Sequence, residues 1–129
     1  MISRRSMLAA AAGFTFLVAG MPALAAEKYS SAAVEAAQKA GKSVLVEISA
    51  PWCPTCKAQR PIIDNLAGSD KYKGFSYFTV DFDTQKDVVK KLNARSQSTL
   101  IVYKGEAEVG RSVGDTDPAK IEGLLAKAL

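Results

Sequence analysis

The sequence predicts an α/β fold in which a central mixed four-stranded sheet carries helices on both faces. Helical and strand patterns alternate along the chain, and such alternation is typical of parallel strand pairs connected through helices. The last two predicted strands are separated by a short turn, so they form an antiparallel edge of the same sheet. The chain has 129 residues, of which 48% are hydrophobic and 23% charged, as is usual for one globular domain.

The first half of the predicted domain contains two helices and one buried strand. A helix is expected over residues 30–39, because alanines dominate it, serines precede it and Gly41 follows it. The near-continuous apolar run over residues 44–48 predicts a buried parallel strand. A second helix is expected over residues 53–66, since Pro54 suits its first turn.

A strand and a helix follow in the middle of the chain. Residues 75–82 are rich in aromatic and β-branched side chains and predict the second strand. A helix is expected over residues 85–92, with Thr84 as its N-terminal cap. The face of this helix that packs on the sheet is expected to hold three apolar residues: Val88, Val89 and Leu92.

The C-terminal part predicts a hairpin and a last helix. Residues 99–103 and 107–113 are the two strands of the hairpin, and a Lys-Gly-Glu turn connects them. Asp117 and Pro118 open the final helix. Its apolar residues recur at helical spacing: Ile121, Leu124, Leu125 and Leu129.

Residues 1–25 predict a cleaved export signal, which leaves residues 26–129 as one folded domain. Two arginines provide the positive start of such a signal, and residues 23–25 (Ala-Leu-Ala) match a small-residue cleavage site. The uncharged apolar run over residues 7–21 would span about 22 Å as a helix, which is shorter than the ~30 Å hydrocarbon core of a membrane. A signal that is removed is therefore favoured over a retained anchor.

Residues 3–8, Ser-Arg-Arg-Ser-Met-Leu, resemble the twin-arginine motif of signals that export folded proteins. Arg4 and Arg5 carry the match, whereas Met7 stands where phenylalanine is common. A Sec-type signal is the alternative. Either route predicts a bacterial protein located in the periplasm, which contacts the membrane only through the uncleaved signal during export.

Three features of the composition exclude several classes of function. The chain contains no histidine, so it cannot form a Ser–His or Cys–His nucleophile pair. All its methionines lie within the predicted signal, so the remaining domain lacks the His and Met ligands of haem and blue-copper sites. The net charge of +4 is not organised into a basic stripe, which argues against nucleic acid as a partner.

The two cysteines, Cys53 and Cys56, stand where the buried strand turns into the second predicted helix. The sequence over residues 50–57 is Ala-Pro-Trp-Cys-Pro-Thr-Cys-Lys, and Pro61 follows five residues after the second cysteine. This arrangement resembles the active site of the thioredoxin family, and the order of strands and helices extends the resemblance over nearly the whole of residues 26–129. The resemblance implies a thioredoxin-like fold and thiol–disulfide oxidoreductase activity on protein disulfides.

The physical chemistry of the cysteine pair supports the same activity. A cysteine at a helix start faces unpaired backbone N–H groups and the positive end of the helix dipole, and both favour the thiolate of Cys53. A thiolate of lowered pKa is the attacking species in disulfide exchange. We expect Cys53 to be the nucleophile, Cys56 to be the resolving thiol, and Cys53–Cys56 to be the redox-active disulfide.

Metal binding through the same two cysteines is the alternative function. A structural zinc needs four N or S ligands, and haem attachment needs a histidine where Lys57 stands. A soft metal such as Cu(I), or an iron–sulfur cluster, is compatible with two thiolates, in particular across a dimer. We expect disulfide exchange by a monomer without a cofactor, with protein thiols and disulfides and a redox partner in the periplasm as its partners.

Two residues near the cysteines complete the predicted machinery. Glu47 interrupts the apolar strand six residues before Cys53, where the family usually places a buried aspartate. A buried carboxylate has a raised pKa, so we expect Glu47 to accept the proton of Cys56, with an ordinary edge-facing glutamate as the alternative. Trp52 is expected to flank the reactive sulfur as part of the substrate-docking surface, with plain packing as the alternative.

The sequence departs from the family pattern just before the third predicted strand. The family has a cis-proline there, followed by threonine, and this chain has Ser98 followed by Thr99. A cis peptide between Gln97 and Ser98 would cost ~3 kcal/mol, against under about 1 kcal/mol for proline, so a trans peptide is expected. By their position, Gln97, Ser98 and Gly114 are the candidates for the groove that binds a substrate strand.

Overall fold

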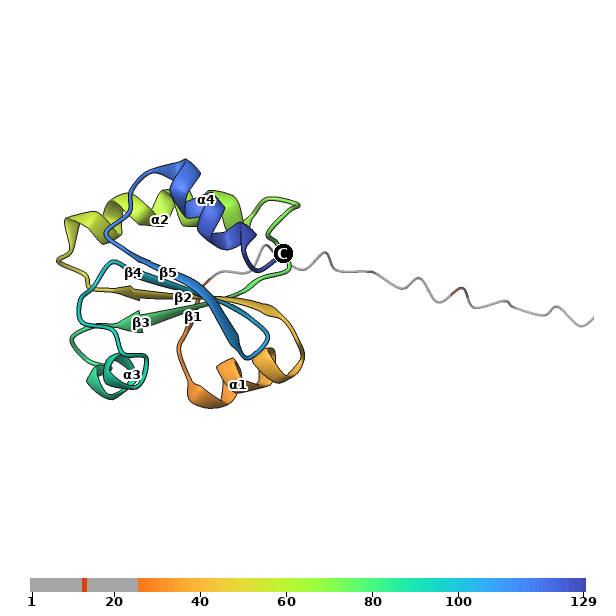
Figure 1. The fold of residues 1–129 in the computed structure, drawn as a ribbon, viewed down its shortest axis with the longest axis horizontal. Helices are drawn as coiled ribbons and strands as arrows, with labels where there is room; N and C mark the ends of the chain where they lie inside the picture. The colour runs from red at the N-terminus through yellow and green to blue at the C-terminus, as the bar shows by residue number, and fades with distance from the viewer. Residues whose placement is uncertain (1–12, 14–25) are drawn as a thin grey trace, which may run out of the picture.

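The computed structural model describes Gly13 and residues 26–129 of the chain. Apart from Gly13, the predicted export signal over residues 1–25 lies outside the described residues. The described chain folds into one sheet with two helices on each face (Figure 1). In this part of the chain, no helix has the length and apolarity needed to cross a membrane.

The sheet has five strands in the order β1-β3-β2-β4-β5. Strands β2 and β3 are parallel, whereas β4 is antiparallel to both β2 and β5. The mixed sheet with helices on both faces is therefore confirmed. The bounds of the strands are β1 Glu27–Lys28, β2 Ser43–Ser49, β3 Ser76–Asp81, β4 Thr99–Lys104 and β5 Ala107–Val113.

The prediction of four strands misses β1. This strand has two exposed residues and pairs in parallel with β3. The pairing continues through the backbone N–H of Tyr29, which donates to the Thr79 carbonyl oxygen at 2.8 Å. A two-residue polar strand has no alternation of apolar side chains, so its sequence carries no strand signal.

The four helices lie close to their predicted ranges: α1 Ser31–Lys39, α2 Pro54–Ala67, α3 Lys86–Lys91 and α4 Pro118–Ala126. The side chains of Ser30 and Asp117 cap α1 and α4 by accepting backbone N–H bonds. The assignment of Thr84 as the cap of α3 is wrong, because the N-cap position belongs to Gln85. The Asp81 carboxylate instead accepts the backbone N–H of Thr84 at 3.1 Å and turns the chain before α3 begins.

Helices α1 and α3 cover one face of the sheet (Figure 1). Val46 of β2 and Ile101 of β4 are completely buried beneath them. Val34 of α1 and Val89 of α3 pack into the same cluster. All the buried side chains of this cluster are aliphatic or aromatic: Tyr29, Val34, Val44, Val46, Ile48, Phe78, Val80, Val89 and Ile101.

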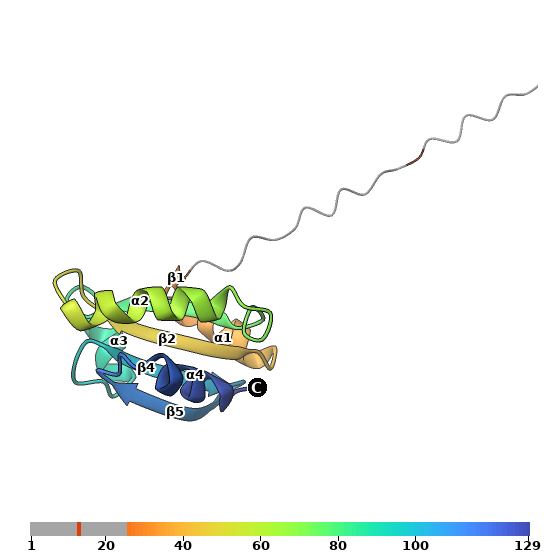
Figure 2. The ribbon, with the colours of Figure 1, turned by 90° about the horizontal axis from the view of Figure 1, so that it is seen from above.

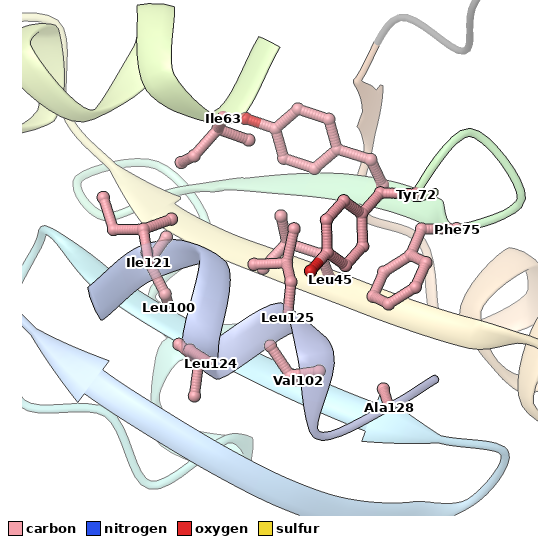
Figure 3. Packing of buried hydrophobic residues seen from close by; sticks show 11 residues of the cluster. Leu45, Ile63, Tyr72, Phe75, Leu100, Val102, Ile121, Leu124, Leu125 and Ala128 are labelled. Carbon is pink, nitrogen blue, oxygen red and sulfur yellow. The ribbon is translucent and has the colours of Figure 1, made fainter. Parts of the chain in front are cut away.

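Helices α2 and α4 cover the opposite face, as Figure 2 shows from above. Figure 3 shows residues of α4 packed over β2 and β4 beside Tyr72 and Phe75. The inclusion of Leu129 in the apolar face of the last helix is wrong. The helix ends at Ala126, Leu129 is exposed, and Ala128 is buried in the cluster instead.

The strand register brings the cysteines to the segment that precedes β4. Cys53 and Cys56 follow the carboxyl end of β2, and Ser98 precedes the first residue of β4. Because β2 and β4 are antiparallel, with Ile48 opposite Thr99, these two ends meet at one end of the sheet.

Candidate active site

The cysteine pair lies at the N-terminus of α2, which begins at Pro54. Cys53 is the N-cap residue and Cys56 lies in the first turn. The two side chains form a disulfide, with Cα atoms 5.3 Å apart. Both cysteines are buried, together with Ala50 and against Phe82. The sequence therefore places the pair where a nucleophilic thiol gains most from the end of a helix.

The backbone around Cys53 favours negative charge on its sulfur. The N–H of Cys56 donates to Cys53 Sγ at 3.1 Å. The first turn of α2 contains no acidic residue, so no carboxylate there opposes the positive end of the helix dipole. When the disulfide is reduced, these groups stabilise the Cys53 thiolate over the thiol.

Ser98 lies against both sulfur atoms. The Gln97–Ser98 peptide is trans, as the sequence predicts, and Ser98 has a φ of 62°, in the left-handed region. Its Oγ is 3.1 Å from Cys53 Sγ and 3.2 Å from Cys56 Sγ. The hydroxyl therefore lies over both sulfurs, at the position where the resemblance to the thioredoxin family implies a proline.

Gln59 connects α2 to the Ser98 segment. This side chain is fully buried, and its Nε2 donates to the carbonyl oxygens of Ser98 at 3.3 Å and Asp115 at 2.8 Å. The Ser98 carbonyl also accepts the N–H of Gly114 at 2.9 Å. One amide group therefore holds the segments before β4 and after β5 against the helix that carries the cysteines.

Glu47 lies inside the protein with two partners on one carboxylate oxygen. The Tyr77 hydroxyl of β3 donates to Oε2, and Nη2 of Arg60 on α2 lies 3.5 Å from the same oxygen. Oε1 is buried and has no hydrogen-bond partner among the residues that the structure describes. The residue is 0% exposed, which is the burial that a proton-accepting role requires.

Burial governs the ionisation of this group. It raises the pKa of Glu47 above its ordinary value, while the Tyr77 hydroxyl and the Arg60 guanidinium hold that pKa down by smaller amounts. Burial and the neighbouring Glu47 carboxylate raise the pKa of Tyr77 far above its ordinary value, so Tyr77 keeps its proton and acts as a donor. Within the described chain, no hydrogen bond joins Glu47 to either cysteine.

An open cleft of about 670 Å³ lies beside Cys56. Lys57 and Arg60 of α2 line it together with Cys56, and Lys28 and Asp81 line it from the strands. Arg60 connects this cleft to the buried Glu47. Its side chain is 45% exposed, and its Nη2 lies 3.5 Å from Oε2 of the fully buried glutamate. The cleft therefore connects the surroundings of Cys56 with solvent and with the guanidinium that contacts Glu47.

The predicted docking residues lie around the cysteines on the surface. Trp52 is 56% exposed, and its indole N–H donates to Oδ2 of Asp83 at 2.7 Å. Gly114 is exposed and Gln97 half-buried. Val113, next to Gly114, is a second large exposed hydrophobic residue at this end of the sheet. Trp52 is thus oriented by a hydrogen bond rather than packed in the core.

The Ser98 hydroxyl occupies one side of the two sulfurs, within 3.2 Å of both. Over Gly13 and residues 26–129, no three His, Cys, Asp or Glu side chains come together in a way that would hold a metal ion. Two sulfurs and one hydroxyl do not complete the four-ligand set that zinc prefers.

Sequence reasoning missed four residues that shape the site: Gln59, Arg60, Tyr77 and Asp83. Gln59 and Arg60 follow Cys56 by three and four residues, the spacing that brings helical side chains to one face. This spacing could have predicted that both lie near Cys56. Tyr77 and Asp83 contact Glu47 and Trp52 across long separations in sequence. Those contacts exist only once β2 and β3 are paired.

A cysteine pair joined at the start of a helix, at the end of the central strand of this fold, defines a thiol–disulfide oxidoreductase. The family model described as Thioredoxin matches residues 20–127 of the chain. The chain belongs to the thioredoxin family.

Individual relatives agree with this assignment. The chain is 39% identical to Thioredoxin-2 of Saccharomyces cerevisiae over 85 residues, which cover 66% of this chain and 79% of the yeast protein. It is 33% identical to Thioredoxin Asp f 29 of Aspergillus fumigatus over 95 residues, which cover 72% and 86% of the two chains. The crystal structure of Trxlp from Edwardsiella tarda is similar at a TM-score of 0.76 and 40% identity, covering 78% of this chain and 98% of that one.

Proposed function

We propose that this thioredoxin-family protein is exported to the bacterial periplasm, where it exchanges disulfides with exported proteins through Cys53 and Cys56. The single observation that carries the chemistry is the position of Cys53 Sγ, which caps α2 and accepts the N–H of Cys56 at 3.1 Å. A sulfur in this position is ionised more readily than a free thiol, so it is the nucleophile of the pair.

The exchange proceeds in two substitutions at sulfur. The Cys53 thiolate attacks one sulfur of a substrate disulfide, forms a mixed disulfide, and releases the other substrate sulfur as a thiolate. Cys56 then loses its proton and attacks Cys53 Sγ, which forms the Cys53–Cys56 disulfide and releases the second substrate thiolate. The substrate is reduced by two electrons and the cysteine pair is oxidised by two.

Glu47 is the proton acceptor in the second substitution. Its buried Oε1 has no hydrogen-bond partner in the described chain, and burial raises its pKa, which makes the carboxylate a better proton acceptor than an exposed one. The cleft beside Cys56 is open to solvent, so water in it carries the proton toward Glu47, whose Oε2 is contacted by Arg60 at the wall of the cleft. Trp52, Gln97, Ser98 and Gly114 form the docking surface for the substrate chain around the sulfurs.

Two cysteine variants of the protein without its signal test the assignment of roles. Cys53→Ser is expected to abolish reduction of insulin disulfides, whereas Cys56→Ser is expected to accumulate mixed disulfides that mass spectrometry detects. In the reduced wild type, Cys53 should alkylate faster than Cys56 and titrate below the free-thiol value of about 8.5. Faster alkylation of Cys56 would show that the roles are reversed.

Location is tested with the full chain in a bacterial host. Arg4 and Arg5 are changed together to lysine, because a twin-arginine signal requires both guanidinium groups and a Sec signal requires only positive charge. Fractionation is expected to find the wild type in the periplasm, cut after residue 25, and the double variant retained inside the cell. Export of the double variant would identify a Sec signal, and retention of the wild type would refute the periplasmic location.

Metal binding is the second candidate, and the geometry gives it less support. The Ser98 hydroxyl already lies within 3.2 Å of both sulfurs, so a soft cation would have to displace it. The test is titration of the reduced protein with Cu(I) or zinc against a competing chromogenic chelator. If metal binds, Ser98→Pro should lower the metal affinity and raise disulfide-exchange activity. Equal metal affinity in the wild type and Ser98→Pro would show that Ser98 has no role in metal binding.

A further inference from the structure

The Ser98 hydroxyl is placed to serve both sulfurs of the cysteine pair. Its oxygen is almost equally distant from the two, at 3.1 Å from Cys53 Sγ and 3.2 Å from Cys56 Sγ. A serine hydroxyl carries one proton on a freely rotating bond, so it can donate to one sulfur at a time and can change partner by rotation alone. Ser98 is 4% exposed, so water does not compete freely for this proton.

The two sulfurs differ in their other hydrogen bonds. Cys53 Sγ accepts the backbone N–H of Cys56 in addition to the contact with Ser98. Within residues 26–129, the only hydrogen-bond partner of Cys56 Sγ is the Ser98 hydroxyl. Charge on Cys56 therefore depends on Ser98 more than charge on Cys53 does.

The backbone of Ser98 is held in a conformation that serine avoids. Its φ of 62° lies in the left-handed region, which is unfavourable for residues other than glycine, asparagine and aspartate. Two donors hold its carbonyl oxygen in this position: the Gly114 N–H at 2.9 Å and Gln59 Nε2 at 3.3 Å. Strained residues that are held by several contacts are concentrated at functional sites.

We propose that Ser98 is a catalytic residue of the exchange, whose single hydroxyl proton stabilises the Cys53 thiolate first and the Cys56 thiolate afterwards, and that Gln59 is the positioning residue that holds it there. This inference rests on the proposed function, because it assigns a role within that reaction. The inference assigns a chemical role, the stabilisation of both thiolates, to the serine that replaces the family's proline.

The proton changes partner as the charge moves. In the reduced protein, the hydroxyl donates to the Cys53 thiolate. After Cys53 has attacked the substrate, its sulfur is bound in the mixed disulfide and carries no charge. The hydroxyl then rotates to Cys56, stabilises the thiolate that forms when Cys56 is deprotonated, and is left without a charged partner when the Cys53–Cys56 bond closes. The serine itself neither gains nor loses a proton in the cycle.

Other charged groups near the sulfurs stay constant in the experiment. The charged side chains in the cleft that Cys56 lines are Lys28, Lys57 and Arg60 with positive charge and Asp81 with negative charge. Glu47 contacts this set through Arg60. None of these residues is changed in the variants below, so a shift of the thiol pKa reports the hydroxyl.

The experiment compares Ser98→Ala and Ser98→Gly, which both remove the hydroxyl and differ in backbone strain. Glycine accepts a φ of 62° without penalty, whereas alanine keeps the strain of serine. Thiolate absorbance against pH should show the Cys53 pKa raised by about one unit in both variants, the size expected for one hydrogen bond to a charged group.

The second measurement isolates the resolving step. Reduced protein is converted to the mixed disulfide of Cys53 with thionitrobenzoate, and release of the coloured thiolate reports the attack by Cys56. This release should be slowed about tenfold in Ser98→Ala and Ser98→Gly, since a pKa shift of one unit is a tenfold change in the equilibrium. The proposal would be overturned if both variants kept the wild-type Cys53 pKa and the wild-type rate of thionitrobenzoate release. It would also be overturned if only Ser98→Ala differed from the wild type.

Gln59→Leu tests positioning. This variant removes both amide hydrogen bonds and keeps an apolar side chain of similar size in the buried site. It should raise the Cys53 pKa in the protein with Ser98 and have no further effect in Ser98→Gly, because it acts through Ser98. Equal pKa shifts in both backgrounds would show that Gln59 acts independently of the hydroxyl.

The same proteins distinguish this inference from the proposed function. If the wild type does not reduce insulin disulfides, the proposed function fails first. If the wild type is active and the Ser98 variants keep its thiol pKa and release rate, only the role of Ser98 is refuted.

Discussion

The two faces of the sheet bury different kinds of side chain. Beneath α1 and α3 the buried side chains are mainly aliphatic or aromatic, such as Val46 and Ile101, and the buried hydroxyl of Thr99 on that face is paired with the Ser96 carbonyl oxygen. On the side of α2 and α4, the fully buried Glu47 and Gln59 interrupt the apolar packing. Buried polar groups cost stability unless they are well paired, and both residues leave one oxygen without a partner in the described chain. Both faces therefore contribute apolar packing, but the face that carries the cysteines also buries Glu47 and Gln59 with incompletely paired oxygens, at a cost in stability.

The largest expected effect is a loss of stability without a change in thiol chemistry, caused by a substitution beneath α1 and α3. Ile101→Ala removes a completely buried side chain and should lower the free energy of unfolding by about 2–5 kcal/mol, measured by denaturant titration. The matched variant Ile101→Val should cost only about 0.5–1.5 kcal/mol. Neither should alter the Cys53 pKa under conditions where the protein is folded. A shifted thiol pKa would show that the two faces are not independent.

On the opposite face, Glu47→Gln should act mainly on chemistry. The amide cannot accept the Cys56 proton, so resolution of the mixed disulfide should slow by about 10²-fold, at the lower end for a general base, while formation of the mixed disulfide is unchanged. Stopped-flow measurement of thiol release from pH 6 to about pH 9 checks this. Identical resolution rates over this range would leave Glu47 a structural residue.

The same variant should also change the pH dependence of stability. Burial raises the pKa of Glu47 in the folded protein, so the folded state holds this proton more tightly than the unfolded chain does. Wild-type stability should therefore fall as pH rises from the ordinary glutamate value through the raised one. Glu47→Gln lacks this loss, and its stability relative to the wild type should be higher at neutral pH than below pH 4.

Tyr77→Phe tests the pairing of the buried carboxylate. Loss of the hydroxyl leaves Arg60 as the remaining partner of Glu47 and should destabilise the protein by about 1–3 kcal/mol at neutral pH. The pKa of Glu47 should rise further, so the destabilisation should shrink as pH falls and the carboxyl is protonated. Denaturant titrations of both proteins at neutral pH and below about pH 4 measure this difference. A cost that does not depend on pH would mean that the hydroxyl acts only through packing.

The smallest effect is expected at the surface. Asp83→Ala removes the acceptor of the Trp52 indole N–H in an exposed hydrogen bond, which should cost about 0.5–1 kcal/mol. Trp52 is the only tryptophan of the chain, so its fluorescence reports the change in orientation in both redox states. Asp83→Asn keeps an acceptor oxygen and is the control. Unchanged fluorescence in Asp83→Ala would show that packing alone orients Trp52.

The sequence supports much of the fold because its signals are local. The apolar run of β2, the alanine-rich α1 and the proline at the start of α2 each express a preference of a few neighbouring residues. Where the local signal is absent or ambiguous, prediction fails. Strand β1 is polar and two residues long, and the cap of α3 depends on Asp81 rather than on the threonine beside the helix.

By itself, the sequence determined the class of chemistry: Cys53 and Cys56 at a helix start, no histidine, and a serine before β4. Only the tertiary structure decided how that chemistry is surrounded. Strand pairing brings Tyr77 to Glu47, and the antiparallel register of β2 and β4 brings the Ser98 hydroxyl to both sulfurs. Spacing along a helix is encoded by its own residues, whereas contacts between distant segments depend on the packing of the whole sheet and its helices.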